Sequence, residues 1–272
     1  METFYQILTI VLTIVLGLAV GSFLNVVIYR MNNNMSLVTP PSHCPKCDAR
    51  IKWYDNIPLL SYIILRGKCR HCHTHISFRY PAVELLNTVL WFIALMMFTN
   101  YIIPSNSMNW LKFVTSCFAL SSLICIFFSD LDYMEIPEIL QLVLLICGLI
   151  LLMDDVNMNN IMLKVFGFIG AGGLFIIVNL IYKLIKKKDG IGFGDVELVA
   201  CAGLILGGYK MIFALLISCV GGALILLSLF LFNRNREKQY PFAVLLVPGI
   251  IIAMFVGDYV INWYMSLLGG GF

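Results

Sequence analysis

Two short stretches place aspartates at the edges of apolar runs. Gly192-Phe193-Gly194-Asp195 leads directly into one such run, and Asp130-Leu131-Asp132 follows another that ends in Phe127-Phe128-Ser129. A charged side chain beside hydrocarbon is costly, so an acid at such a position indicates function. Two neighbouring carboxylates cannot both ionise, so one activates water while the other donates a proton. If Asp130 and Asp195 meet, this sequence therefore predicts the chemistry of aspartyl proteolysis.

Other hydrolytic chemistries find no support in the sequence. All four histidines lie between residues 43 and 75, and neither Gly-x-Ser-x-Gly nor His-Glu-x-x-His occurs. A transporter or channel that uses Asp130 and Asp195 as a cation or proton site is the alternative from another class. It predicts an internal repeat relating two halves of the chain, and none is evident. A zinc-anchored scaffold without catalysis is a third hypothesis.

Four cysteines form two closely spaced pairs. Cys44 and Cys47 make one Cys-x-x-Cys, Cys69 and Cys72 the other, and 21 residues separate the pairs. This spacing is typical of a four-cysteine zinc site. The loop is too small to order itself by apolar burial, and a metal would supply folding energy. Two disulfides are the alternative, disfavoured in the cytoplasm; the nearby histidines (His71, His73, His75) are expected to be surface residues.

The composition indicates a multi-pass membrane protein. Of 272 residues, 60% are hydrophobic and 12% charged, whereas soluble domains carry about 25% charged residues. We expect an all-α fold of about eight transmembrane helices with a small cytoplasmic zinc-knuckle loop. The first segment lacks the basic start of a cleavable signal peptide. The expected apolar segments are 4–29, 82–103, 111–129, 136–153, 162–182, 196–209, 211–232 and 242–264. The expected parts are a first helix (1–29), the cysteine loop (30–80) and the peptidase bundle (81–272).

Basic residues are distributed unevenly between the two sides of this bundle. With the N-terminus outside, the loops facing the cytoplasm carry 15 Lys and Arg and the opposite side carries 3. This asymmetry predicts both termini outside and Asp130 and Asp195 at the cytoplasmic face. The cytoplasmic loops in this count are 30–80, 130–135, 183–195 and 233–241.

Several polar or small residues interrupt the first two helices. Gly17 and Gly21, four residues apart, predict a close helix contact. Asn25 is either a structural or a substrate-side polar group. Arg30 is expected to extend to the membrane surface. Glu84 either pairs with a cation on the cytoplasmic side or is an interfacial acid favoured by a helix N-terminus, and we favour the second interpretation.

Together these motifs resemble the bacterial type IV prepilin peptidases, the leader peptidases of the Gly-x-Gly-Asp aspartyl class. The similarity covers nearly the whole chain. The cysteine loop between the first two helices makes it specific, because Gly-x-Gly-Asp also occurs in presenilin-like proteases. The matching stretches are Gly21 to Arg30, Cys44-Pro-x-Cys47, Asn56 to Tyr62, Arg66 to Cys72, Arg79 to Glu84, Asp130-x-Asp132 with Ile136-Pro137, and Gly192 to Asp195.

The resemblance implies a catalytic pair of Asp130 and Asp195, with Asp132 as the fallback for the first. It implies cleavage of type IV prepilins or pseudopilins after a Gly that ends a short basic leader, at the inner face of the bacterial cytoplasmic membrane. For many members it also implies N-methylation of the new terminus with S-adenosylmethionine, and no nucleic-acid partner. Two residues depart from the family pattern: Glu197 replaces a usual Lys, and Glu138 a usual Asp.

Overall fold

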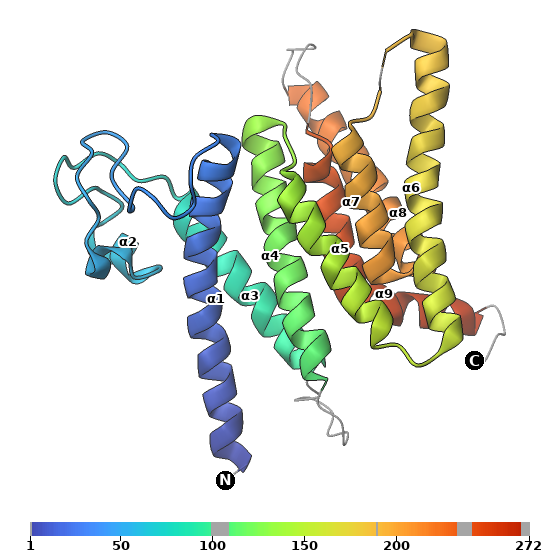
Figure 1. Cartoon of the computed structure of the whole chain (residues 1–272), viewed down its shortest axis with the longest axis horizontal. Helices are drawn as coiled ribbons and strands as arrows, with labels where there is room; N and C mark the ends of the chain where they lie inside the picture. Colours follow the sequence, from blue (N-terminus) through green and yellow to red (C-terminus); the bar gives the residue numbers. More distant parts are fainter. Residues whose placement is uncertain (1, 99–108, 189, 233–240, 268–272) are drawn as a thin grey trace. The chain divides into compact units, whose positions relative to one another are not determined.

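The computed structural model describes residues 2–98, 109–188, 190–232 and 241–267 of the chain. The described residues are almost entirely helical (Figure 1). Eight long helices lie in these ranges: α1 (Glu2–Asn32), α3 (Arg79–Phe98), α4 (Trp110–Tyr133), α5 (Glu138–Met153), α6 (Met158–Lys186), α7 (Phe193–Leu206), α8 (Gly208–Phe232) and α9 (Ala243–Leu267). The cysteine loop adds the short 3-10 helix η1 (Trp53–Asn56) and the one-turn helix α2 (Leu60–Ile64).

Each of these helices overlaps one of the eight apolar segments expected from the sequence, and residues 99–103 of the second segment lie outside the described residues. Six of them (α1, α3, α4, α6, α8 and α9) are long and apolar enough to cross a membrane. The other two are shorter, with 16 residues in α5 and 14 in α7, whereas a full crossing needs about 20. The all-helical membrane fold is confirmed, and eight crossings remain a prediction.

The chain forms two compact units that divide between Cys125 and Ile126, inside α4. The first unit holds α1, the cysteine loop, α3 and the first part of α4. The second holds the end of α4 and α5 to α9. Both acids of the expected catalytic pair, Asp130 and Asp195, belong to the second unit.

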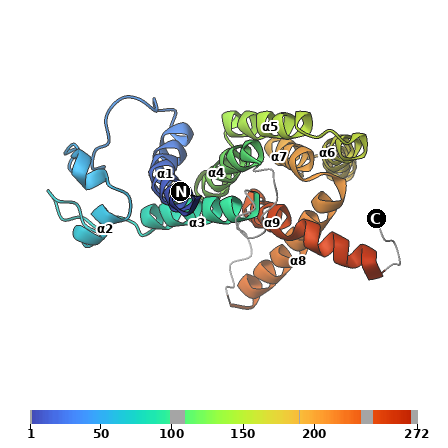
Figure 2. The same cartoon turned by 90° about the horizontal axis from the view of Figure 1, so that it is seen from below.

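In the first unit α1 packs closely against α3 (Figure 2). A Cβ atom added at Gly21 would lie 2.7 Å from the Glu84 Cα, and one added at Gly17 would lie 3.0 Å from the Thr88 Cα. Only glycine allows the backbones to approach so closely. Asn87 strengthens the contact by donating a hydrogen bond of 2.8 Å to the Gly17 carbonyl. The close packing expected at Gly17 and Gly21 is present.

In the second unit the short helix α7 contacts α5, α6, α8 and α9. Most of its side chains are buried, including Leu198, Val199 and Ala202. At its crossing with α6, a Cβ added to Gly203 would overlap the Gly167 carbonyl. Tight packing on several sides therefore holds α7, the helix that begins with the Gly-x-Gly-Asp turn.

One expected boundary is wrong. The third apolar segment was expected to end at Ser129, which would place Asp130 and Asp132 in a loop, but α4 continues to Tyr133. Helical hydrogen bonding persists after the apolar residues end, and the Met134 N–H still donates to the Asp130 carbonyl. Met134 then has a φ of 54°, a left-handed conformation typical of a helix end. Both aspartates thus have fixed helical positions.

Candidate active site and metal centre

Asp195 lies in the first turn of α7. Gly192 precedes the helix in an extended conformation, with a φ of −64° and a ψ of 145°. The Asp195 N–H donates to the Gly192 carbonyl at 3.2 Å. An acid in this position is favoured because the N-terminal end of a helix carries partial positive charge. The Gly-x-Gly-Asp turn therefore places Asp195 in the first turn of α7.

Asp130 lies near the end of α4, and only 6% of its surface is exposed. Its Oδ2 accepts a hydrogen bond of 3.3 Å from the Val244 N–H, and the Ala243 N–H is a second donor. Both donors belong to the first turn of α9, where backbone N–H groups lack helical partners. The buried carboxyl of Asp130 is thus held by the start of another helix.

The second unit brings these two acids together. The Asp195 carboxyl lies close enough to Asp130 for their charges to interact. Asp132, two positions further along α4, is exposed. Residues two apart on a helix point to different sides, so the last turns of α4 carry one buried acid and one exposed acid.

Gln141 on α5 also belongs to this site, although it lies outside the motifs that predict the catalytic pair. Its side chain is 3% exposed, and its Nε2 donates a hydrogen bond of 2.8 Å to the Gly194 carbonyl. Its Oε1 is buried without a hydrogen-bond partner among the described residues. A glutamine inside an apolar helix was the available signal, because polar groups there usually have a function.

The two residues that depart from the family pattern lie near each other. Glu138 begins α5 and Glu197 is in the first turns of α7. Their negative charges interact. The departure at Glu197 therefore places a negative charge beside another acid, whereas Glu138 keeps the charge of the usual Asp.

The four cysteines of the loop converge on one point. Their sulfurs all lie within 4.8 Å of one another, and all four are free thiols. The Cys44 and Cys72 sulfurs are 3.8 Å apart, which is the separation that Zn–S bonds of about 2.3 Å give in a tetrahedron. Hydrogen bonds from the backbone N–H groups of Cys72 and His71 lower the pKa of Cys69 to about 7, whereas burial and the neighbouring thiols raise the pKa of Cys47.

The two halves of this cluster have the same backbone geometry. The Asp48 N–H donates to the Cys44 carbonyl at 2.9 Å, and the His73 N–H donates to the Cys69 carbonyl at 3.0 Å. Asp48 and His73 both have a φ of 55°. The cluster thus consists of two equivalent turns that could hold one metal ion, and among the described residues it contains no histidine.

Arg30 and Glu84 are both more buried than their expected roles imply. The Arg30 side chain does not extend into solvent. It is 6% exposed and donates to the Ser36 carbonyl at 2.8 Å and to the Pro40 carbonyl at 2.5 Å. Glu84 is a buried residue, 7% exposed, whose Oε2 accepts a hydrogen bond of 2.8 Å from the Leu59 N–H. The loop folds back over the ends of both helices and covers these side chains, which a pattern along a single helix does not reveal.

Fold and site together define a multi-pass membrane protein with a buried acid, Asp130, a partly buried acid, Asp195, and a four-cysteine loop. The chain matches the model described as "Bacterial Peptidase A24 N-terminal domain" over residues 15–98 and the "Type IV leader peptidase family" over residues 117–227. It belongs to the type IV leader peptidase family and is therefore a membrane-embedded peptidase.

Similar proteins named prepilin leader peptidase/N-methyltransferase cover most of the chain. The protein from Legionella pneumophila is 36% identical over 92% of each chain. That from Pseudomonas aeruginosa is 32% identical over 94% of this chain and 93% of its own, and that from Neisseria gonorrhoeae is 30% identical over 94% of each. No solved structure matches this chain.

Proposed function

We propose that Asp130 and Asp195 are the catalytic pair of a membrane aspartyl peptidase that removes the leader from type IV prepilins or pseudopilins. The observation that supports this most directly is that Asp130 and Asp195, on helices far apart in the sequence, lie within the range over which the charge of Asp130 acts on the Asp195 carboxyl. The burial of Asp130 and the exposure of Asp132 favour Asp130 as the first member.

In this mechanism the two carboxyls share one proton. The ionised member takes a proton from water as the water attacks the scissile carbonyl, and the protonated member donates to the developing oxyanion. The two acids titrate as a pair. The N–H groups of Ala243 and Val244 orient Asp130 by their hydrogen bonds, and the first turn of α7 orients Asp195.

The substrate assignment rests on the names of the relatives and on the charge distribution. Those relatives are named prepilin leader peptidases. The excess of Lys and Arg in loops 30–80 and 183–195 supports a cytoplasmic position for the site; loop 233–241, also counted, lies almost wholly outside the described residues. A leader cut on that side leaves the substrate's hydrophobic stem in the bacterial inner membrane.

Two further assignments concern bound groups. The tetrahedral spacing of the thiols supports one structural Zn²⁺ held by Cys44, Cys47, Cys69 and Cys72.

The same relatives are named N-methyltransferases, which supports methylation of the new N-terminal amine. S-adenosylmethionine would supply the methyl group for that second activity.

The test compares Asp130→Asn, Asp195→Asn and the unchanged chain, each purified in lipid nanodiscs and incubated with a synthetic prepilin. Mass spectrometry reports both loss of the leader and any added methyl group. We expect cleavage to fall at least ~100-fold in either variant, because each loses an acid–base group. Unchanged melting temperatures would show that the variants remain folded. Full cleavage by a folded variant would contradict the catalytic pair.

A further inference from the structure

Asn179 ties the segment before the Gly-x-Gly-Asp turn to α6. It lies near the end of that helix, and its Oδ1 accepts hydrogen bonds from the Gly190 N–H at 2.9 Å and the Ile191 N–H at 3.1 Å. A side-chain amide oxygen has two lone pairs and can accept both bonds at once. Figure 1 shows α6 extending past the start of α7, so the chain returns along α6 before α7 begins. Asn179 therefore holds the two residues directly before Gly192.

Tyr182 supports the same segment through its ring. A Cβ added at Gly190 would lie 2.5 Å from the Tyr182 Cδ1 and 2.7 Å from its Cγ, so only a glycine backbone can lie this close to the ring. Residues three apart on a helix are neighbours on its surface. One face of α6 thus holds Gly190 by a hydrogen bond from Asn179 and by contact with Tyr182.

The segment needs such external support because its own sequence restricts it little. Three of the five residues from 190 to 194 are glycines, and glycine has the greatest conformational freedom to lose on folding. Residues 190, 192 and 193 are exposed, so burial does not fix their backbone. Hydrogen bonds from neighbouring helices must therefore decide where this segment lies.

The position of this segment is transmitted to Asp195 through one residue. Ile191 is bonded to Gly192, whose carbonyl accepts the Asp195 N–H at 3.2 Å. At the other end of the turn, Gln141 on α5 donates to the carbonyl before Asp195 at 2.8 Å. Side-chain amides of two helices thus hold the turn, Asn179 where the chain enters it and Gln141 where the chain leaves it.

We propose that Asn179 is a positioning residue for peptide cleavage, which holds the entrance of the Gly-x-Gly-Asp turn so that α7 presents the Asp195 carboxyl at the catalytic pair. Asn179 acts through the backbone of residues 190–192 and not by contact with the substrate. This inference rests on the proposed role of Asp195, and its tests separate the two.

The first test is steady-state cleavage of a synthetic prepilin by the full chain in nanodiscs. Asn179→Leu has a similar size but lacks the acceptor; it should lower kcat about 10-fold with KM changed less than about twofold, because a misplaced carboxyl affects mainly the transition state. Asn179→Asp should restore kcat to within about threefold of the unchanged chain, since a carboxylate oxygen can accept the same N–H groups.

Asn160→Leu is the matched control, because it makes the same change at an exposed position near the start of α6. It should cleave like the unchanged chain. A normal kcat in Asn179→Leu, a rise in KM alone, or a kcat as low in Asn179→Asp as in Asn179→Leu would overturn the positioning role.

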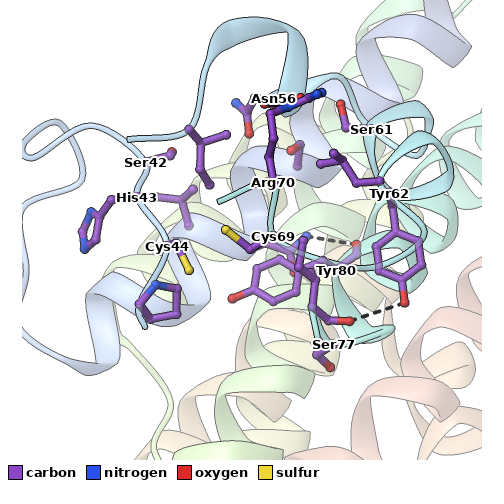
Figure 3. Close-up of a pocket in the computed structure, with 18 of the residues that line it drawn as sticks. Ser42, His43, Cys44, Asn56, Ser61, Tyr62, Cys69, Arg70, Ser77 and Tyr80 are labelled. Atoms are coloured by element: carbon purple, nitrogen blue, oxygen red, sulfur yellow. Dashed lines mark hydrogen bonds and ion pairs between the residues drawn. The ribbon is translucent and has the colours of Figure 1, made fainter. Parts of the chain in front are cut away.

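The second test is amide hydrogen exchange, which does not depend on activity. In Asn179→Leu the N–H groups of residues 190 and 191 lose their acceptor and should exchange about 10-fold faster. The cavity in Figure 3, lined by Tyr62, Tyr80 and Arg70, belongs to the first unit, so peptides from residues 54–80 serve as the internal reference. Unchanged exchange at 190–191, or an equal increase in the reference peptides, would contradict a local hold by Asn179.

The failure of this inference and the failure of the catalytic assignment give different results. If Asp195→Asn is inactive while Asn179→Leu cleaves normally, the positioning role alone is refuted. If a folded Asp195→Asn cleaves normally, the catalytic pair is refuted, and with it the role of Asn179 in cleavage, even where the exchange result shows that Asn179 holds the turn.

Discussion

The side-chain amide of Gln141 donates a hydrogen bond of 2.8 Å to the backbone carbonyl of Gly194, the residue directly before Asp195. This bond joins α5 to the Gly-x-Gly-Asp turn. A Cβ added at Gly194 would lie 3.2 Å from the Gln141 Nε2 and 3.4 Å from the Ile136 Cβ, so the turn is also enclosed by the chain around α5. Gln141 is thus a positioning residue for Asp195.

Gln141→Met should lower kcat for prepilin cleavage about tenfold, with KM changed less than about twofold, since a misplaced carboxyl affects mainly the transition state. Stability should fall by about 1 kcal/mol, the typical contribution of one hydrogen bond. Steady-state kinetics and denaturant unfolding measure the two effects. Leu142→Met, at an exposed neighbour, is the control. A rise in KM alone would indicate a substrate contact instead.

Asp130 and Asp132 are distinguished by their burial. Asp132→Asn should retain cleavage within about threefold of the unchanged chain, because that side chain is exposed, whereas Asp130→Asn should lose at least ~100-fold. The same prepilin assay compares them. If Asp132→Asn were the inactive variant and Asp130→Asn the active one, the first catalytic acid would have to be reassigned.

Metal removal should destabilise the cysteine loop. Elemental analysis should find about one zinc per chain, lost in the double variant Cys44→Ser, Cys69→Ser, because four thiolates complete the tetrahedral shell. Chelation should increase proteolysis between residues 30 and 80, since binding supplies folding energy. Lowering the pH should also release the metal, because protons compete for the thiolates. Disulfides in the freshly purified chain would contradict the metal site.

Where α6 crosses α7, the position of Gly203 should tolerate no side chain. Gly203→Ala forces a Cβ against the Gly167 carbonyl and should cost about 1–3 kcal/mol, the range for overpacking. Gly170 on α6 has no atom within 4 Å of its added Cβ, so Gly170→Ala should be neutral or stabilising by up to ~1 kcal/mol. Thermal unfolding in nanodiscs compares the pair. Equal melting temperatures would show that α7 can move away from α6.

Local patterns in the sequence determined most of the helices and the four-cysteine cluster. In lipid, the backbone N–H and C=O groups of an apolar segment must form hydrogen bonds within the segment. Such a segment therefore forms a helix, whichever other segments surround it. Each Cys-x-x-Cys pair is likewise a local turn, and the observed turns at Cys44 and Cys69 repeat one geometry. The small residues Gly17 and Gly21 marked a close helix contact for the same local reason.

Tertiary structure decided which polar groups meet. Nothing near Gln141 in the sequence indicates its bond to Gly194, 53 residues away. The sequence also did not reveal that Arg30 and Glu84 are buried, because the cysteine loop covers both and supplies their hydrogen-bond partners. Likewise Asp130 is buried and Asp132 exposed only because α4 continues as a helix and α9 begins beside one of them. Residue type and spacing encode local conformation, whereas contacts between distant segments depend on how the helices pack.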